Sequence, residues 1–336
     1  MNASLLATNR LEWIDIAKGV GIILVVVGHT GRGLSAVYFP DGTGFLQSMD
    51  KAIYAFHMPL FFLLSGITFG MRPPSTIQPA LLNRALRFFY TLVVWTYAFL
   101  GMRALAGDMS NAGGSWLDLL QAPLPPFAHF WFLWALLINM VLFAVLRLEM
   151  RSILPDILFW TVATFVSVAV SFTVNLPQQF APWLGHALDY SFVFTVGGII
   201  GSSQLVRAVP SLTIASLGSL LFVFFLWASI SIELPINDVV GGLVLSLLLL
   251  LPLITLSTYL GRSAGGRALA FLGVISLAIY VMHIIFSAGI RIALINGGYF
   301  DLKLHLVSGI FAGILGPLLV YLMARRANML RILGLA

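Results

Sequence analysis

The sequence predicts an all-α integral membrane protein, built as a bundle of about ten transmembrane helices. Of its 336 residues, 60% are hydrophobic and only 9% are charged, whereas a soluble globular domain has about 25% charged residues. Apolar runs recur along the whole chain, and a membrane-spanning helix needs about 20 apolar residues. The composition also excludes a disordered chain, which needs low hydrophobicity and a high net charge. We expect residues 1–336 to form a single membrane domain with no soluble domain.

The predicted spans follow one another with mostly short polar connections. The sixth has a short apolar run, and losing it would move the C-terminus to the other side of the membrane. The longest connection, residues 103–129, is rich in Gly, Pro and polar residues, which predicts an outer loop or lid. In chain order the expected spans are Ile14–Gly33, Tyr54–Gly70, Leu82–Gly101, Phe130–Leu146, Ile157–Val174, Tyr190–Gly201, Leu212–Ile232, Val239–Tyr259, Leu269–Ile290 and Leu304–Ala324.

The charged residues alternate between the two sides that these spans define. Arginines gather at both termini and in the even-numbered connections, and most acidic residues lie in the others. The positive-inside rule then places both termini in the cytoplasm. Ten spans fit this alternation, and nine or eleven would break it. The net charge of +6 is scattered among apolar segments, so it reports topology and we expect no nucleic-acid partner.

Several kinds of chemistry are excluded by residues and motifs that the sequence lacks. It contains no cysteine, which excludes a disulfide framework, a thiolate metal site and a cysteine nucleophile. It also lacks the Gly-x-Ser-x-Gly elbow, the His-Glu-x-x-His zinc motif and the phosphate loop. We therefore expect no bound metal, no permanently bound cofactor and no use of ATP.

The ionisable residues Asp15, Lys18 and His29 lie in the first span, where the cost of burying them makes each a candidate for function. Asp15 and Lys18 are three residues apart, so they can pair on one helix face. Lys18 and His29 lie within about 20° of the same face and about 16 Å apart along the axis. Alternatively, Lys18 extends to the membrane interface and His29 is a hydrogen-bonded core residue. The shared face favours a functional role.

For two further sets of basic residues, both a functional and a structural interpretation stay open. His57 opens the second span at a level similar to that of His29, either as a catalytic group or as an interfacial anchor. Arg84 and Arg87 share a face at the cytoplasmic start of the third span. Two guanidinium groups near a helix N-terminus suit phosphate groups, but positive-inside bias would also place arginines there.

Two later segments hold further histidines. His283 lies in the second half of the ninth span, where it either faces the cavity of His29 or packs as a satisfied core residue. His129 precedes an aromatic cluster that includes Trp131 and is typical of an interfacial aromatic belt.

Five segments together carry a resemblance to a known family. Asp15–His29 contains a basic residue, ten residues and then His, and Phe56–Gly66 follows as a second helix. Arg84–Arg87 has the pattern Arg-x-x-Arg, and His129–Leu133 and Ile279–His283 match later landmarks. These segments resemble acyltransferase family 3, integral membrane O-acyltransferases that modify bacterial surface and secreted glycans. The start of the first helix is closest to the branch named for fucose 4-O-acetyltransferase.

The resemblance implies an O-acetyltransferase of the bacterial inner membrane, with acetyl-CoA as co-substrate and a sugar hydroxyl as acceptor. A general base would act on that hydroxyl, and cytoplasmic cations would hold the CoA phosphates. The predicted site consists of His29 and His57 as catalytic residues, and of Asp15, Lys18, Arg84, Arg87, His283 and Trp131 as substrate-binding residues.

Two departures from the family pattern matter. Some members carry a Glu after the Trp-containing motif of the fourth helix, but Trp131–Ala135 contains no acid, so the group that orients His29 is not identified. The chain also lacks the extracytoplasmic hydrolase-like domain of other members, so we expect transfer to finish within the membrane domain. The expected partners are acetyl-CoA, a carbohydrate acceptor and membrane lipid. The glycan, the hydroxyl position, an acyl group other than acetyl, an acyl-enzyme intermediate and a homo-oligomer are left open.

Two other classes of function compete with this interpretation. A proton-coupled transporter or flippase for a glycan or lipid-linked intermediate would use Lys18, His29 and His57 as a relay. A non-catalytic membrane scaffold would tolerate substitution of His29.

Overall fold

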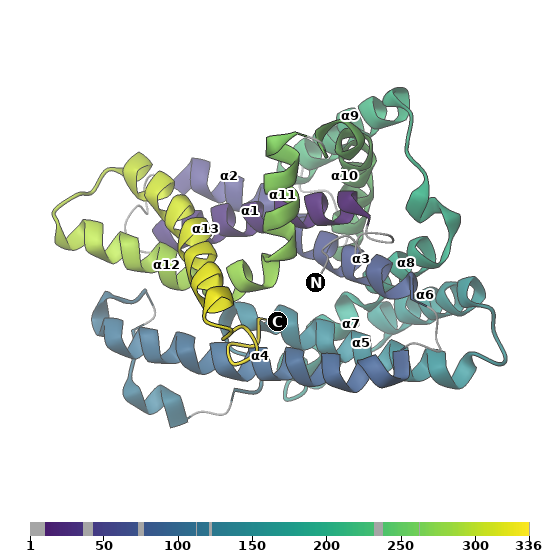
Figure 1. The fold of residues 1–336 in the computed structure, drawn as a ribbon, viewed down its shortest axis with the longest axis horizontal. Helices are drawn as coiled ribbons and strands as arrows, with labels where there is room; N and C mark the ends of the chain where they lie inside the picture. Colours follow the sequence, from purple (N-terminus) through teal and green to yellow (C-terminus); the bar gives the residue numbers. More distant parts are fainter. Residues whose placement is uncertain are drawn as a thin grey trace.

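The computed structural model is all-α, as the sequence predicts, with no strand in the residues that it describes (Figure 1). These residues are 11–35, 43–72, 77–111, 113–120, 123–231, 238–261 and 263–335. The α-helices are α1 (Glu12–Ser35), α2 (Thr43–Tyr54), α3 (His57–Gly70), α4 (Ile77–Ala106), α5 (Trp131–Met150), α6 (Asp156–Thr173), α7 (His186–Asp189), α8 (Ser191–Ser202), α9 (Leu212–Ser231), α10 (Asp238–Leu260), α11 (Ala264–Val274), α12 (Ser276–Asn296) and α13 (Leu302–Arg326).

Nine helical segments of the described chain are long and apolar enough to cross a membrane. The expected sixth span corresponds to α8, whose 12 residues are too few to cross alone. It directly continues a helical stretch, because residues 181–202 are helical except for Tyr190. The expected ninth span is divided at Ile275, where α11 ends and α12 begins. The cytoplasmic placement of both termini stays a prediction from the charge pattern.

The helix that carries Lys18 and His29 is enclosed by the rest of the bundle. α1 contacts α2, α3, α10, α11, α12 and α13, and Figure 1 shows it in the middle of the molecule. In an apolar 18-residue stretch of α1, 67% of the residues are buried, compared with 17% in the corresponding stretches of α6, α9 and α13. The exposed faces of those three helices hold large apolar side chains such as Phe165, Phe224 and Phe311. They are the surfaces that lipid would cover, whereas Asp15 and Thr30 of α1 are buried within the protein.

Close contact between α1 and α11 depends on glycine. A Cβ atom at Gly19 would collide with the carbonyl oxygen of Leu269, and one at Gly273 would collide with that of Asp15. The backbones can approach so closely only because neither position has a side chain. This packing fixes the half of α1 that carries Asp15 and Lys18.

The long helix α4 runs below α1 in Figure 1, and both helices run from right to left in that view. The end of the chain packs against the middle of α4, where three side chains donate hydrogen bonds to backbone carbonyls. Tyr90 donates to Ile332, Thr91 to Gly334 and Trp95 to Leu333. This contact joins the segment after α13 to α4, near the point where Figure 1 marks the C-terminus.

Candidate active site

Three histidines that are far apart in the sequence meet at the C-terminal half of α1. His29 belongs to α1, His129 to the short helix η5 (Ala128–Phe130) and His283 to α12. The ring centroid of His29 lies 5.1 Å from that of His283 and 6.1 Å from that of His129. The centroids of His129 and His283 are 5.5 Å apart. Each ring of this three-histidine cluster therefore contacts the other two.

The backbone of α12 fixes the position of the proton on His283. Its Nδ1 lies 2.7 Å from the carbonyl oxygen of Tyr280 and 3.2 Å from that of Ile279. Because a carbonyl oxygen only accepts, Nδ1 carries the proton and Nε2 of the neutral ring keeps its lone pair. His283 is fully buried, and its Nε2 has no hydrogen-bond partner within the described part of the chain.

His129 is held through its backbone and by aromatic packing. The Tyr280 hydroxyl donates a hydrogen bond to the carbonyl oxygen of His129, and the ring packs against Phe99 and Phe130. Both ring nitrogens are buried and have no hydrogen-bond partner among the described residues. No group of three or more His, Asp or Glu side chains in the described ranges is arranged to hold a metal ion.

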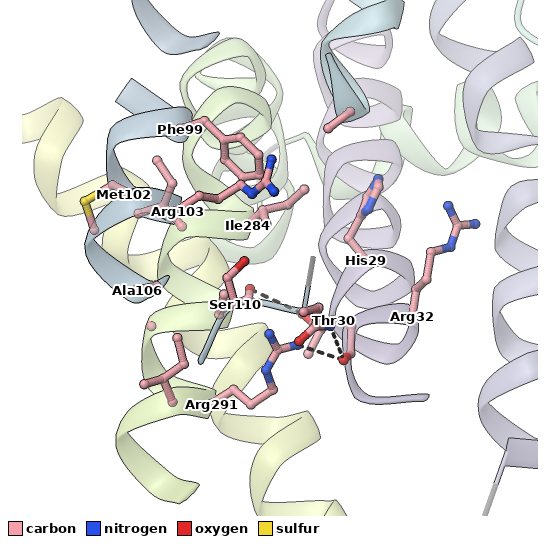
Figure 2. A pocket seen from close by; sticks show the side chains of 18 of the residues that line it. His29, Thr30, Arg32, Phe99, Met102, Arg103, Ala106, Ser110, Ile284 and Arg291 are labelled. Atoms are coloured by element: carbon pink, nitrogen blue, oxygen red, sulfur yellow. Dashed lines mark hydrogen bonds between the residues drawn. The ribbon is translucent and has the colours of Figure 1, made fainter. Parts of the chain in front are cut away.

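A cavity of about 350 Å³ lies beside this cluster, and His29 is the member of the cluster that lines it (Figure 2). Its walls come from α1, α4 and α12, with Phe99 and Ile284 opposite His29 in the view of Figure 2. His129 and His283 contact His29 without lining the cavity. His29 is therefore the one member of the cluster that a molecule in this cavity would meet, and His305 of α13 is a second imidazole in the cavity wall.

Three arginines also line the cavity, and no carboxylate does so among the described lining residues. Each arginine donates at least one hydrogen bond to a protein oxygen. These bonds run from Arg32 to the carboxylate of Asp50, from Arg103 to the carbonyl of Gly113, and from Arg291 to the carbonyl of Gly33. The cavity is thus apolar with a cationic rim, which suits a ligand rich in oxygen atoms.

Asp15 and Lys18 lie in the first half of α1, about four and about three turns before His29 respectively. Asp15 is buried and Lys18 is half-buried, and neither lines the cavity. The helix is continuous from Glu12 to Ser35, so the separation of about 16 Å between Lys18 and His29 applies. Their roles in substrate binding stay predictions.

Arg84 and Arg87 lie near the start of α4, at the end away from the cavity. Arg84 is half-buried and Arg87 is exposed, and Arg87 donates a hydrogen bond to the carbonyl oxygen of Asn83. Phe99 and Arg103 of the same helix line the cavity, and Arg84 precedes Phe99 by about 22 Å of helix. α4 and α1 therefore share one pattern, with a cationic N-terminal half and a C-terminal half at the cavity.

The other two predicted site residues lie outside the cluster and do not line the cavity. His57 is buried, and its Nδ1 donates to the carbonyl oxygen of Ile53 at 2.8 Å while its ring contacts Tyr54. Trp131 packs against His186 and Tyr190. The structure thus joins His283 to His29 but brings neither His57 nor Trp131 into contact with them. Their predicted roles stay untested.

Sequence reasoning missed the importance of His129. The aromatic residues that follow it favoured an interfacial belt, and Phe130 does pack against its ring. The available signal was its place among the family-like segments, since His129–Leu133 and Ile279–His283 were both recognised there. Only the fold shows that these two segments meet, through Tyr280 and the two histidines.

Comparison with known proteins matches residues 11–322 to the family described as acyltransferase domain, acyltransferase family 3. Because the match covers almost the whole chain, this protein belongs to that family. The nine apolar helical segments of the described chain then make it a multi-pass membrane protein of an acyltransferase family, as the sequence predicts. The family membership favours this interpretation over the transporter, the flippase and the scaffold.

Two curated relatives are nodulation proteins named NolL. The protein from Sinorhizobium fredii is 34% identical over 153 residues, which are 44% of this chain and 40% of that relative. The protein from Mesorhizobium japonicum is 31% identical over 140 residues, which are 41% of this chain and 36% of that relative. The matched segments thus span less than half of each relative. No solved structure matches the chain significantly.

Proposed function

We propose that this acyltransferase transfers an acetyl group from cytoplasmic acetyl-CoA to a hydroxyl group of a surface or secreted glycan. His29 is the proposed general base, and the cavity beside it is the proposed acceptor site. The observation that carries this proposal is that His29 belongs to the buried three-histidine cluster and also lines the cavity. A general base must have contact with both its substrate and the groups that orient it.

The proposed reaction needs one base and no covalent enzyme intermediate. His29 takes the proton of the acceptor hydroxyl as its oxygen bonds to the carbonyl carbon of the thioester. The bond between this carbon and the CoA sulfur breaks, and the leaving thiolate takes the proton from His29. Atoms and charges balance, and His29 returns to its neutral form.

The donor is proposed to enter from the end of the bundle that carries Lys18, Arg84 and Arg87. Cationic side chains hold phosphate groups through charge-assisted hydrogen bonds. Lys18 precedes His29 by about 16 Å along α1, and an extended pantetheine arm has a comparable reach. Acetyl-CoA and the acceptor would then approach His29 from opposite directions, with Asp15 pairing with Lys18.

The bacterial inner membrane is the proposed location. The nine apolar helical segments of the described chain require a membrane, and both curated relatives come from bacteria. The positive-inside pattern then places the Lys18 end in the cytoplasm, where acetyl-CoA is available.

The experiment that tests this function measures acetyl-CoA binding by the purified protein in detergent. The wild type is compared with the Arg84→Ala, Arg87→Ala double variant by isothermal titration calorimetry. We expect saturable binding by the wild type and binding weakened at least about tenfold in the double variant, because two charge-assisted contacts are removed. Arg151→Ala, which removes an exposed arginine of another connection, serves as the matched control and should bind like the wild type.

Each outcome bears on the proposal. If the folded wild type does not bind acetyl-CoA, the proposed donor is wrong. Equal binding by the wild type and the double variant would mean that Arg84 and Arg87 do not hold acetyl-CoA and serve only to orient the protein in the membrane.

A further inference from the structure

A neutral histidine that acts as a general base needs an acceptor for the proton on its second nitrogen. One ring nitrogen takes the substrate proton, so the other must carry a proton already. Many enzymes supply a carboxylate that accepts this second N–H and fixes the ring. In the described structure, the titratable groups that act electrostatically on His29 are His283, His129, Arg32 and His57, and none is a carboxylate.

Of these four groups, His283 and His129 each have a ring nitrogen without a hydrogen-bond partner among the described residues, and His283 is the nearer, with its ring centroid 5.1 Å from that of His29 against 6.1 Å for His129. Arg32 is a donor and is engaged with Asp50. The Nδ1–H of His57 is engaged with Ile53, and the ring of His57 makes no ring contact with His29 among the described residues. His283 points its protonated Nδ1 at its own helix, so its Nε2 lies on the opposite side of the ring.

The distance between the two rings fits a hydrogen bond that forms when substrate is bound. Two imidazoles joined by an N–H···N bond of about 3 Å have centroids about 5 Å apart. The centroids of His29 and His283 are 5.1 Å apart, with the ring planes inclined by 60°. Hydrogen bonds in active sites are often loose without substrate and tighten in the reacting complex, so a rotation of the His29 ring completes the contact.

We propose that His283 is the positioning residue for His29, in the place that a carboxylate occupies in other enzymes. Its Nε2 accepts the N–H of His29, which aims the other nitrogen of His29 into the cavity as the base. No proton leaves His29 along this bond. When His29 takes the acceptor proton, its N–H becomes part of an imidazolium, and the bond to His283 becomes charge-assisted and stronger.

The surroundings of His283 keep its lone pair directed at His29. The carbonyls of Tyr280 and Ile279 both face Nδ1, so the other tautomer would lose a buried hydrogen bond. A proton on Nε2 in place of the lone pair would be a buried donor without a partner among the described residues. His129 packs on both rings and closes the cluster.

This inference rests on the proposed function of His29, and two substitutions of His283 test it. In His283→Gln, the side-chain amide reaches the position of Nε2 and can offer an oxygen to His29. In His283→Asn, the shorter amide reaches only the position of Nδ1 and leaves His29 without an acceptor. We expect His283→Gln to keep kcat within about tenfold of the wild type, and His283→Asn to lose about 100-fold or more, as for a misaligned base.

The split between kinetic constants separates positioning from substrate binding. Because His283 does not line the cavity, KM for the acceptor and the Kd of acetyl-CoA should stay close to wild-type values in both variants. Thr255→Val is the control for loss of a buried hydrogen bond, since the Thr255 hydroxyl donates to the carbonyl oxygen of Pro210 and neither residue lines the cavity. It should lower the unfolding temperature without changing kcat.

A measurement on the wild type keeps the inference testable even if both variants fail to fold. Nitrogen-15 NMR of histidine-labelled protein in detergent should show His283 protonated at Nδ1 and unprotonated at Nε2. His29→Ala should shift the His283 Nε2 resonance. An Nε2-protonated His283 would overturn the inference, as would His283→Asn with wild-type kcat, or a folded His283→Gln as inactive as His283→Asn. If His29→Ala itself retains full activity, the proposed function fails, whatever the His283 variants do.

Discussion

The two ends of α1 differ in how their polar residues are used, although they belong to one continuous helix. At the His29 end, rings from three distant segments form a cluster beside a cavity. At the Lys18 end, the helix packs closely on α11 and lines no part of that cavity. Under the proposed function, the His29 end performs the chemistry and the Lys18 end binds the donor. Substitutions at the His29 end should change kcat, and substitutions at the Lys18 end should change KM for acetyl-CoA.

The largest effect is expected from His29→Ala, which removes the base itself. We expect kcat to fall by about 1,000-fold, within the range that general-base catalysis contributes, with little change in acetyl-CoA binding. Transfer of label from radioactive acetyl-CoA to membrane glycan measures this effect. Folding is checked by thermal unfolding in detergent. Full activity in a folded His29→Ala protein would contradict the proposed role of this end.

The next effect is expected from filling the cavity with Ala288→Trp. Ala288 lines the cavity on α12 and is half-buried, so an indole there would occupy the space of the acceptor. We expect kcat/KM for the acceptor to fall by about 100-fold, because small displacements from the reactive geometry are costly. Acetyl-CoA binding should not change.

Ala288→Ser is the matched control for the cavity variant, since it changes the same residue but leaves the volume of the cavity nearly unchanged. It should behave as the wild type. If Ala288→Trp transfers acetyl groups normally, the acceptor does not bind in this cavity.

A smaller effect is expected at the other end from Lys18→Met, which keeps an unbranched side chain one atom shorter and removes its charge. We expect KM for acetyl-CoA to rise about tenfold, the value of one charge-assisted contact, with kcat nearly unchanged. Initial rates over a range of acetyl-CoA concentrations measure both constants. A fall in kcat at unchanged KM would mean that the two ends are not separate in function.

The smallest effect is expected from Asp50→Asn at the rim of the cavity. The ion pair of Asp50 with Arg32 is partly exposed, with 42% of the Arg32 side chain accessible. Such pairs contribute less than about 1 kcal/mol to the free energy of unfolding. The pair of Arg147 with Asp156 offers a contrast, because only 1% of the Arg147 side chain is accessible.

Asp156→Asn should therefore lower the free energy of unfolding by about 2 kcal/mol or more, since it leaves a buried guanidinium without its counter-charge. Thermal unfolding of the two variants in the same detergent gives the comparison. Equal losses of stability would show that burial does not distinguish these two pairs.

The sequence by itself determined the class of protein and the placement of Lys18 and His29 on one face of α1. Hydropathy and length identify membrane helices because each helix must satisfy its own backbone hydrogen bonds in lipid. The helical period alone places Lys18 and His29 on one face, and the continuous helix Glu12–Ser35 agrees with it. The family-like segments around these residues led to the acyltransferase interpretation, which the family match confirms.

Sequence reasoning failed where the outcome depends on contacts between distant helices. The short sixth span, Tyr190–Gly201, matches α8 (Ser191–Ser202), but the helical residues that precede α8 and the separation of α11 from α12 at Ile275 were not expected. Neither feature has a local signal as strong as hydropathy. His129 and His283 are more than 150 residues apart, and neither can be assigned to the surroundings of His29 by periodicity.

Only the tertiary structure decided which histidines meet and which of them lines a cavity. Periodicity acts within one helix, where the covalent chain fixes the angle between residues. The relative rotation of two helices is set instead by side-chain packing between them. The sequence therefore fixes His29 on α1, and packing brings His283 to it.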